Sequence, residues 1–285
     1  MVKRIFISAA VIAFIGLSTY CSKDNPSESK DNNPDSTAIE GWELVWNDEF
    51  NGSSINLDKW EYEVNGSGGG NNELQYYTDR AVNSFIENGK LVIKALQEVY
   101  TGGDNQTRYY TSARLRTLNK GDWLYGRFDV KAKLPYGQGL WPAIWMLPTD
   151  WEYGGWAASG EIDIVEMLGQ ETRKIYGTIH YGGSYPANTH KGGSYTLKEG
   201  TFAGDFHVFT LEWEEKEMRW YVDGKLYYTQ NDWYTTNGNY PAPFDKRFHL
   251  LLNVAVGGNW PGNPVESTTW PQQMDVEYVR VYKKK

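Results

Sequence analysis

The chain consists largely of short runs in which apolar or β-branched residues alternate with polar ones, and this pattern restricts its fold more than any other feature. Clusters of turn-forming residues separate the runs, and Asp223-Gly224 between two of them is typical of a β-hairpin. No long amphipathic helical pattern interrupts the series. The runs are KLVIKALQE, YGRFDVKAKL, PAIWML, EIDIVEM, KIYGTIHY, HVFTLEWEE, EMRWYVDGKLYY, RFHLLLNVAV and MDVEYVRVYK. They predict an all-β protein, either an antiparallel sandwich or a barrel.

The composition changes abruptly at Gly41, where the sequence GWELVWNDEF begins. The preceding segment, residues 21–40, contains no aromatic residue after Cys21 and is rich in Ser, Asp, Asn and Pro, which predicts a flexible tether. Residues 41–285 show no second linker and no internal repeat, so one domain is expected there. The 13 Trp residues exceed the usual need of a core. Core packing and the lining of a carbohydrate cleft explain this excess equally well.

The formal charge of −8 becomes −10 when residues 1–20, with Lys3 and Arg4, are removed. An acidic chain without a basic stripe argues against nucleic acid and other polyanions as partners. A neutral polymer remains compatible with this charge. We expect the domain to act as a monomer.

The N-terminus begins with a short basic stretch followed by apolar residues 5–17, too short to span a bilayer comfortably. Residues 1–20 are therefore predicted to be a signal peptide for export. Cleavage before Cys21, the only cysteine, would resemble a bacterial lipoprotein signal, although Tyr20 stands where a small residue is usual. We expect Cys21 to be lipidated and to hold the protein on a membrane, such as the outer membrane or cell surface. Plain secretion and a retained anchor are the alternatives.

Residues 159–169, SGEIDIVEMLG, place three carboxylates in a stretch that otherwise resembles a buried strand. On a helix, at about 100° per residue, Glu161 would face away from Asp163 and Glu166. On a regular strand Glu161 and Asp163 share one face, but Glu166 falls on the other. A β-bulge at Ile164–Val165 would return Glu166 to the shared face. We therefore predict a bulged strand carrying all three acids on one side.

Two glutamates so placed suit glycoside hydrolysis. Their backbones would lie about 13 Å apart, and side chains leaning together would bring the carboxyl groups to about 5 Å, the spacing of a retaining rather than an inverting enzyme. Asp163 between them would help to separate their pKa values. The spacing does not decide which glutamate is the nucleophile. A calcium site and a solvated strand face are the alternatives, although the stretch lacks a calcium-binding loop.

The motif GEIDIVE resembles the signature of glycoside hydrolase family 16. Its Glu-x-Asp-x-x-Glu form is similar to that of the laminarinases, whereas lichenases and xyloglucan transglycosylases typically carry Glu-x-Asp-x-Glu. The segments that also resemble the family, in order within residues 41–285, are NNELQYYT, TSARLRT, YGRFDVKAKLPYGQGLWPAIWMLP, YGGWAASGEIDIVE, GTIHYGG, NVAVGGNWPGNP and VEYVRVY. The resemblance implies a concanavalin-like β-jelly-roll sandwich of two curved antiparallel sheets with a concave substrate cleft. It also implies retaining endo-hydrolysis of β-1,3-glucan, extending to mixed-linkage β-1,3-1,4-glucan.

The resemblance assigns roles to the three acids: Glu161 is the nucleophile, Glu166 the general acid/base and Asp163 the assisting carboxylate. The positions that it implies bind sugar are Asn72, Arg114, Trp141, Trp145, His180 and Trp260. Trp141 and Trp145 would line the cleft floor, and Trp260 would form a wall on the non-reducing side. Core positions for His180 and Trp145, and an acid partner beneath the sheet for Arg114, are the alternatives. Trp123 and Trp156 are left outside the predicted site.

The family often carries a structural calcium ion on the convex face. The matching positions here are the backbone carbonyls of Glu49 and Gly89, and Glu277 in place of the usual aspartate. Catalysis by two carboxylates requires no metal or other cofactor. Other functions remain open: hydrolysis of another polysaccharide such as a galactan, non-catalytic glucan binding on the same fold, and transglycosylation. The intact carboxylate trio argues against the binding protein, and the bulged motif argues against the xyloglucan type of transglycosylase.

Overall fold

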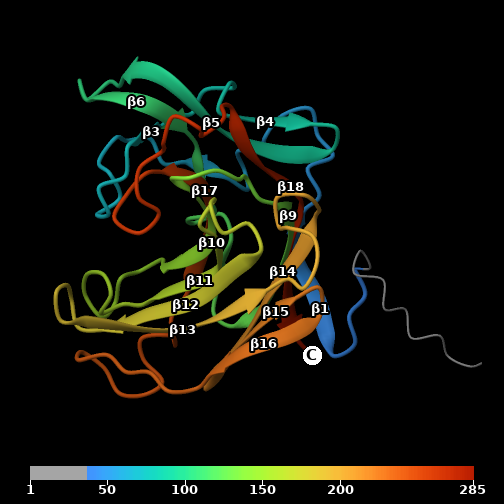
Figure 1. The fold of residues 1–285 in the computed structure, drawn as a ribbon. Helices are drawn as coiled ribbons and strands as arrows, with labels where there is room; N and C mark the ends of the chain where they lie inside the picture. Colours follow the sequence, from blue (N-terminus) through green and yellow to red (C-terminus); the bar gives the residue numbers. More distant parts are fainter. Residues whose placement is uncertain (1–36) are drawn as a thin grey trace, which may run out of the picture. The chain divides into compact units, whose positions relative to one another are not determined.

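The computed structural model describes residues 37–285, and within that range every helix or strand element is a strand. The strands form two sheets (Figure 1). Side chains from both sheets contribute to one hydrophobic core. All pairings are antiparallel except that of β3 with β6. The arrangement is the predicted jelly-roll sandwich, so the all-β fold class is confirmed.

One sheet has ten strands, in the order β16-β15-β14-β9-β18-β5-β6-β3, with β1 added beside β18 and β4 beside β5. Their bounds are β1 Trp42–Asp48, β3 Gln75–Tyr77, β4 Ser84–Glu87, β5 Lys90–Thr101, β6 Thr107–Ser112, β9 Gly126–Lys133, β14 His207–Glu214, β15 Glu217–Val222, β16 Lys225–Gln230 and β18 Gln272–Lys284.

The other sheet has eight strands, in the order β13-β12-β11-β10-β17-β7-β2, with β8 added beside β17. Their bounds are β2 Glu61–Tyr62, β7 Arg114–Arg116, β8 Asp122–Trp123, β10 Leu140–Pro148, β11 Glu161–Glu166, β12 Lys174–Gly182, β13 Asn188–Thr196 and β17 Phe248–Val256. This sheet carries the carboxylate strand, β11, between β10 and β12.

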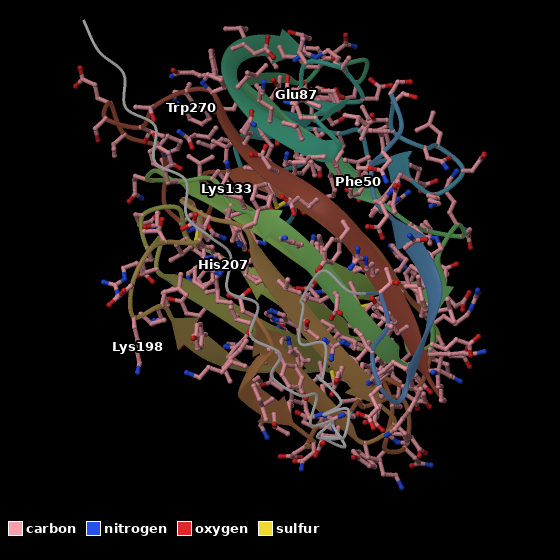
Figure 2. All side chains as sticks on the ribbon, turned by 90° about the vertical axis from the view of Figure 1, so that its right-hand side faces the viewer. Phe50, Glu87, Lys133, Lys198, His207 and Trp270 are labelled. Atoms are coloured by element: carbon pink, nitrogen blue, oxygen red, sulfur yellow. The ribbon has the colours of Figure 1, made fainter. Side chains whose placement is uncertain are left out.

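The apolar residues that alternate with polar ones in the sequence point into the core, and the polar residues between them lie on the outer face of the sheet. In β9, Phe128, Val130 and Ala132 are buried in the core, while Lys131 and Lys133 lie on the outer face of the ten-stranded sheet (Figure 2). The predicted hairpin is confirmed, because β15 and β16 are joined at Asp223-Gly224. Both residues have positive φ, 48° and 74°, as a two-residue turn of this hand requires.

The predicted signal peptide, residues 1–20, and the lipidation site Cys21 lie outside the described residues. Across residues 37–285, no helix has the length and apolar character needed to cross a bilayer.

Candidate active site

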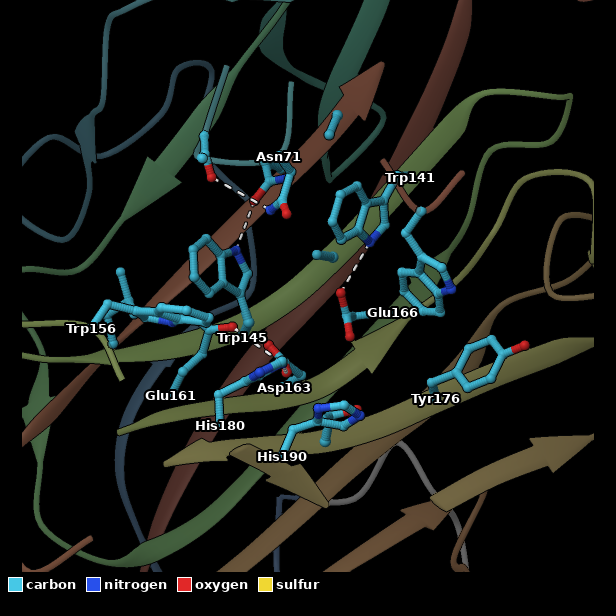
Figure 3. Close-up of a pocket in the computed structure, with 18 of the residues that line it drawn as sticks. Asn71, Trp141, Trp145, Trp156, Glu161, Asp163, Glu166, Tyr176, His180 and His190 are labelled. Carbon is cyan, nitrogen blue, oxygen red and sulfur yellow. Dashed lines mark hydrogen bonds and ion pairs between the residues drawn. The ribbon is translucent and has the colours of Figure 1, made fainter. Parts of the chain in front are cut away.

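A cleft of about 1410 Å³ lies over the outer face of the eight-stranded sheet (Figure 3). Its floor is built from alternate residues of neighbouring strands, because side chains two apart on a strand point the same way. The floor residues are Trp141, Ala143, Trp145 and Leu147 of β10, Glu161, Asp163 and Glu166 of β11, Tyr176, Thr178 and His180 of β12, and Asn253 and Ala255 of β17. Aromatic and carboxylate side chains thus share one open surface.

The predicted bulge is present in β11. Asp163 pairs with Thr178 and Glu166 with Tyr176, so Ile164 and Val165 together stand opposite the single residue Gly177 of β12. The pairing with β10 shifts at the same place. Ile164 and Val165 are both buried in the core, and Glu166 returns to the cleft face beside Glu161 and Asp163. The bulge prediction is confirmed.

The bulge is supported from the opposite sheet. Trp220 of β15 is fully buried, and its indole Nε1 donates a hydrogen bond of 2.9 Å to the backbone carbonyl of Asp163. A Cβ atom on Gly177 would lie 2.5 Å from Cδ1 of this indole. Only glycine therefore leaves room for the ring that holds the bulged strand.

Each predicted catalytic glutamate accepts a hydrogen bond from an indole. Trp156 Nε1 donates to Glu161 Oε2 at 2.7 Å, and Trp141 Nε1 donates to Glu166 Oε1 at 3.0 Å. An indole N–H is only a donor, so the oxygen atom that it binds must act as an acceptor. The two tryptophans therefore orient the two carboxyl groups and favour a proton on the other oxygen of each.

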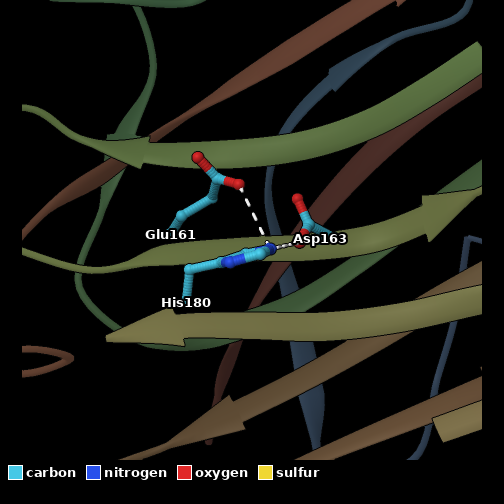
Figure 4. Close-up of side chains that lie close together, drawn as sticks. All are labelled: Glu161, Asp163 and His180. Carbon is cyan, nitrogen blue, oxygen red and sulfur yellow. Dashed lines mark ion pairs between the residues drawn. The ribbon is translucent and has the colours of Figure 1, made fainter. Parts of the chain in front are cut away.

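Asp163 and His180 complete the centre of the cleft (Figure 4). The imidazole Nε2 of His180 lies 3.4 Å from Asp163 Oδ2 and 3.7 Å from Glu161 Oε1. His180 faces Glu161 directly, because the two residues are paired across β11 and β12. Its ring is also 5.5 Å, between centroids, from those of Trp156 and His190. The structure thus places His180 in the cleft, not in the core.

Burial raises the pKa of all three carboxyl groups, because water no longer solvates the charged form. The charge of Asp163 raises the pKa of Glu161 and Glu166 further, and His180 and the indole hydrogen bonds oppose this rise. Three acids so close together cannot all ionise freely near neutral pH. The group is therefore able to hold both an ionised and a protonated carboxyl group at once.

Arg114 both lines the cleft and pairs with acids. Its guanidinium donates to Glu63 Oε1 at 3.1 Å and lies 3.8 Å from Glu73 Oε2. It also lies 5.2 Å from the centre of the Trp145 ring. Trp145 in turn donates from Nε1 to Asn253 Oδ1 at 2.7 Å and is half-buried. Arg114 thus supports the cleft floor beneath Trp145, and Trp145 is not purely a core residue.

Trp260 and Asn72 lie toward the other end of the cleft, and only Trp260 lines it. The Trp260 ring is 41% exposed and makes edge contacts with Trp141 and Tyr176 at 5.5 and 5.0 Å. Asn72 has a φ of 58° and points its side chain to Asn259, whose Oδ1 accepts its amide at 2.9 Å. Its neighbour Asn71 lines the cleft in its place. Asn259 itself lines the cleft, so Asn72 lies directly behind the lining, and its predicted contact with sugar stays a prediction.

Several lining residues were not predicted. Tyr176 and Thr178 share the alternation of His180 along β12, so their place on the cleft face was available from the period of the strand. Trp151, Trp156 and Tyr185 come from loops, where no period indicates direction. Trp123, the other tryptophan left outside the site, packs against the core between Trp46 and Phe128.

A second, smaller pocket brings together the three residues implied for calcium. Glu49, Gly89 and Glu277 all line it, together with Arg280. Neither carboxylate is free, however: Arg280 binds Glu49 through two hydrogen bonds of 2.9 and 2.8 Å, and Lys131 lies 3.0 Å from Glu277. Calcium requires oxygen ligands, preferably charged ones. Lys131 therefore occupies Glu277, the only side chain that the resemblance assigns to calcium, whereas the contacts of Arg280 concern the Glu49 side chain and not its backbone carbonyl.

Comparison with known proteins places these features among carbohydrate-active enzymes. The sequence profile of glycosyl hydrolases family 16 matches residues 70–280. A protein of Niallia circulans named glucan endo-1,3-beta-glucosidase A1 is 46% identical over 88% of this chain, which spans 39% of that protein. A glucan endo-1,3-beta-glucosidase of Cryptopygus antarcticus is also 46% identical, over 84% of this chain and 91% of its own length. The crystal structure of the laminarinase catalytic domain of Thermotoga maritima superposes with a TM-score of 0.77 at 44% identity, covering 86% of this chain and all of that domain.

Proposed function

Because the chain belongs to glycosyl hydrolase family 16, we propose that it hydrolyses internal β-1,3-glucosidic bonds of laminarin-type glucan with retention of configuration. The observation that supports this most strongly is the placing of Glu161, Asp163 and Glu166 on one face of the bulged strand β11, at the floor of an aromatic cleft. Mixed-linkage β-1,3-1,4-glucan is a further proposed substrate. A neutral glucan agrees with the acidic composition.

In the first step of the proposed mechanism, a carboxylate oxygen of Glu161 attacks the anomeric carbon. The glycosidic bond breaks, and Glu166 gives its proton to the leaving oxygen, which leaves a covalent glycosyl-enzyme. In the second step a water molecule gives a proton to Glu166 and attacks the same carbon, which releases Glu161 as a carboxylate. Both steps use only groups of this chain and water, so no metal or other cofactor takes part.

The indole contacts decide where the catalytic proton lies. Trp141 donates to Oε1 of Glu166, which favours Oε2 as the position of the acidic proton. Trp156 donates to Glu161 and favours the ionised form that attacks. The buried Asp163 has the opposite influence, because its charge raises the pKa of both glutamates. These contacts orient the two glutamates, whose pKa values burial raises alike to about 8, so the difference in their roles comes from their positions relative to the sugar.

The aromatic walls suit the apolar faces of glucose rings, which stack on indole and phenol side chains. We propose that Trp141, Trp145 and Trp260 bind the glucan and that His180 contacts its hydroxyl groups. Arg114 acts chiefly by holding Trp145 in place. We propose Asn71 beside Asn72 as the polar contact on that side.

The experiment compares the wild type and Glu161→Gln on laminarin, mixed-linkage glucan, agarose and carrageenan, and sizes the products. We expect the wild type to cut laminarin to oligosaccharides and the variant to lose at least a thousandfold in kcat, because the nucleophile is gone. Glu43→Gln, on the outer strand β1 where Glu43 pairs with Lys283, is the matched control and should keep full activity. Cleavage of agarose but not laminarin would contradict the substrate, and undiminished cleavage by Glu161→Gln would contradict the nucleophile.

We propose further that the protein is exported and attached through a lipid on Cys21, and that the domain is monomeric. The support for export and lipidation is the sequence of residues 1–25 alone. We expect the wild type, expressed in a bacterium that processes lipoproteins, to be cleaved before Cys21 and to sediment with membranes, and Cys21→Ser to lose this attachment once its signal peptide is removed. Equal membrane attachment of both proteins would contradict lipidation.

A further inference from the structure

We propose that Glu161, Asp163 and His180 form a three-ligand site for a borderline transition-metal ion such as Zn²⁺ or Cu²⁺, and that the bound ion reversibly blocks the cleft. Strand β11 supplies the two carboxylates from one face, and β12 supplies the imidazole directly opposite Glu161. The three ligand atoms lie within 4.8 Å of one another. The binding of the ion does not depend on the proposed function, whereas the inhibition rests on it.

The distances suit a tetrahedral ion. Metal–ligand bonds of about 2.0–2.1 Å place two ligand atoms of a tetrahedron about 3.3–3.4 Å apart. The imidazole Nε2 of His180 is already 3.4 Å from Asp163 Oδ2 and 3.7 Å from Glu161 Oε1. The three side chains converge on one point (Figure 4), so small rotations are enough to bring all three atoms to an ion between them. All three residues line the cleft, which leaves the fourth position to water.

The polar chemistry of the site points to a ligand as well. Asp163 is only 2% exposed, and among the described residues its Oδ2 atom has no hydrogen-bond partner although it points toward His180. A buried carboxylate oxygen without a partner is costly, and a cation would satisfy it. The two carboxylates also match the charge of a divalent ion.

The donor set selects the class of ion. An imidazole together with carboxylates is typical of Zn²⁺, Cu²⁺, Co²⁺ and Ni²⁺, whereas Ca²⁺ and Mg²⁺ need more oxygen ligands than are present here. The second ring nitrogen of His180, Nδ1, has no hydrogen-bond partner among the described residues. Such a partner normally strengthens metal binding tenfold to a hundredfold. The site is therefore suited to reversible binding and not to a permanent structural ion.

The consequence is competition between metal and glucan. An ion on Glu161 occupies the oxygen atoms that would attack the anomeric carbon, and it fills the centre of the cleft. Added Zn²⁺ should therefore raise the apparent KM for laminarin without lowering kcat, and EDTA should restore the original kinetics.

The test measures metal binding directly. Zn²⁺ is titrated calorimetrically into the full chain, and Co²⁺ binding is followed by the visible absorption that a tetrahedral site produces. We expect one zinc ion per chain, and at least a tenfold loss of affinity in His180→Gln and in Asp163→Asn. If His180→Gln does not fold, Asp163→Asn still tests the site. The matched control is His207→Gln: His207 also pairs with a carboxylate, Asp223 at 2.7 Å, but on the ten-stranded sheet (Figure 2).

Unchanged zinc affinity in both folded variants would overturn the proposal, as would the absence of zinc binding to the wild type at millimolar concentration. Equal losses in His207→Gln would show non-specific binding and would also overturn it. Zinc that binds at the site but inhibits without raising KM would overturn the competition. A wild type that binds zinc through His180 yet cuts no glucan would refute the proposed function and leave the metal site intact.

Discussion

At the scale of single residues, the cleft contains two similar indole–carboxylate pairs whose glutamates have different catalytic roles. Glu161 attacks as an anion, and Glu166 must carry a proton. Both accept one hydrogen bond from a tryptophan, at 2.7 and 3.0 Å. The indole N–H fixes which oxygen is free in each carboxyl group. Removing it should therefore change both the rate and the pH at which the proton is lost.

Trp141→Phe should lower kcat/KM for laminarin by roughly 2–10-fold, since a hydrogen bond to the neutral, protonated carboxyl group contributes about 0.5–1.5 kcal/mol. The bond from Trp141 lowers the pKa of Glu166, so its loss should move the basic limb of the pH profile to higher pH. Trp145→Phe is the matched control, because its N–H binds Asn253 and not an acid. It should weaken binding and leave that limb in place. The same shift in both variants would show that the Trp141 bond does not set the pKa.

Glu166 also affects stability. Burial raises the pKa of Glu166 from its usual 4.5 to about 8, so between these values the folded state binds more protons than the unfolded state. The free energy of unfolding should then fall as pH rises through this window. Glu166→Gln removes the effect while keeping the shape. We expect the variant to match the wild type near pH 4.5 and to be more stable than the wild type near pH 8. Calorimetric melting at both pH values tests this, and parallel curves would contradict it.

At the scale of elements, the bulge in β11 allows a strand to present residues 161, 163 and 166 on one face. Deleting Ile164 should convert the bulge into regular pairing and leave all three acids facing the cleft. Deleting Ile162 should instead turn Glu161 away, because that residue lies in the regular part of the strand. Both deletions remove one buried isoleucine, so each is the control for the other.

We expect the Ile164 deletion to retain measurable laminarin hydrolysis and the Ile162 deletion to lose it. Both should lower the free energy of unfolding by about 2–5 kcal/mol, the usual cost of removing a large core side chain. Equal activity in the two folded variants would show that the bulge does not determine which face of the strand Glu166 occupies.

The elements also show what could be predicted from sequence. Glu166 was placed correctly because strand residues alternate between two faces, and Glu166 is out of phase with Glu161 and Asp163. A bulge of one extra residue returns it to their face. The direction of the Asn72 side chain depends on a left-handed φ of 58°, which sequence alternation does not report, and its role in sugar binding stays a prediction. Trp156 was omitted because it lies in a loop, where no strand alternation indicates the direction of a side chain. The strand floor was thus predictable, and the loop-borne walls were not.

At the scale of the whole molecule, the two sheets were predicted by pattern and resemblance, but the charge pairing of the second pocket was not. Which cation meets Glu49 or Glu277 depends on strands far apart in the sequence, β1, β9 and β18. The resemblance therefore gave the calcium positions and could not show that Arg280 and Lys131 neutralise their carboxylates.

We expect the melting temperature of the wild type to be the same, within about 1 °C, in excess Ca²⁺ and in EDTA. Glu277→Asp shortens the side chain and restores the family aspartate, so this variant should gain stability on addition of calcium. Differential scanning calorimetry measures both. A clear rise of the wild-type melting temperature with calcium would show that the backbone carbonyls of Glu49 and Gly89 bind the ion unaided.

The hydrogen bond from Trp220 to the carbonyl of Asp163 has a consequence for how the enzyme can evolve. The ring belongs to β15, in the sheet that contributes no residue to the cleft lining, yet it binds strand β11, which carries the three acids. Substitutions beneath that ring can shift the acids without altering any surface that a glucan touches. Selection for altered catalysis in a random library should therefore yield hits in β15 and β16 as well as in the cleft, and surveys restricted to lining residues would overlook them.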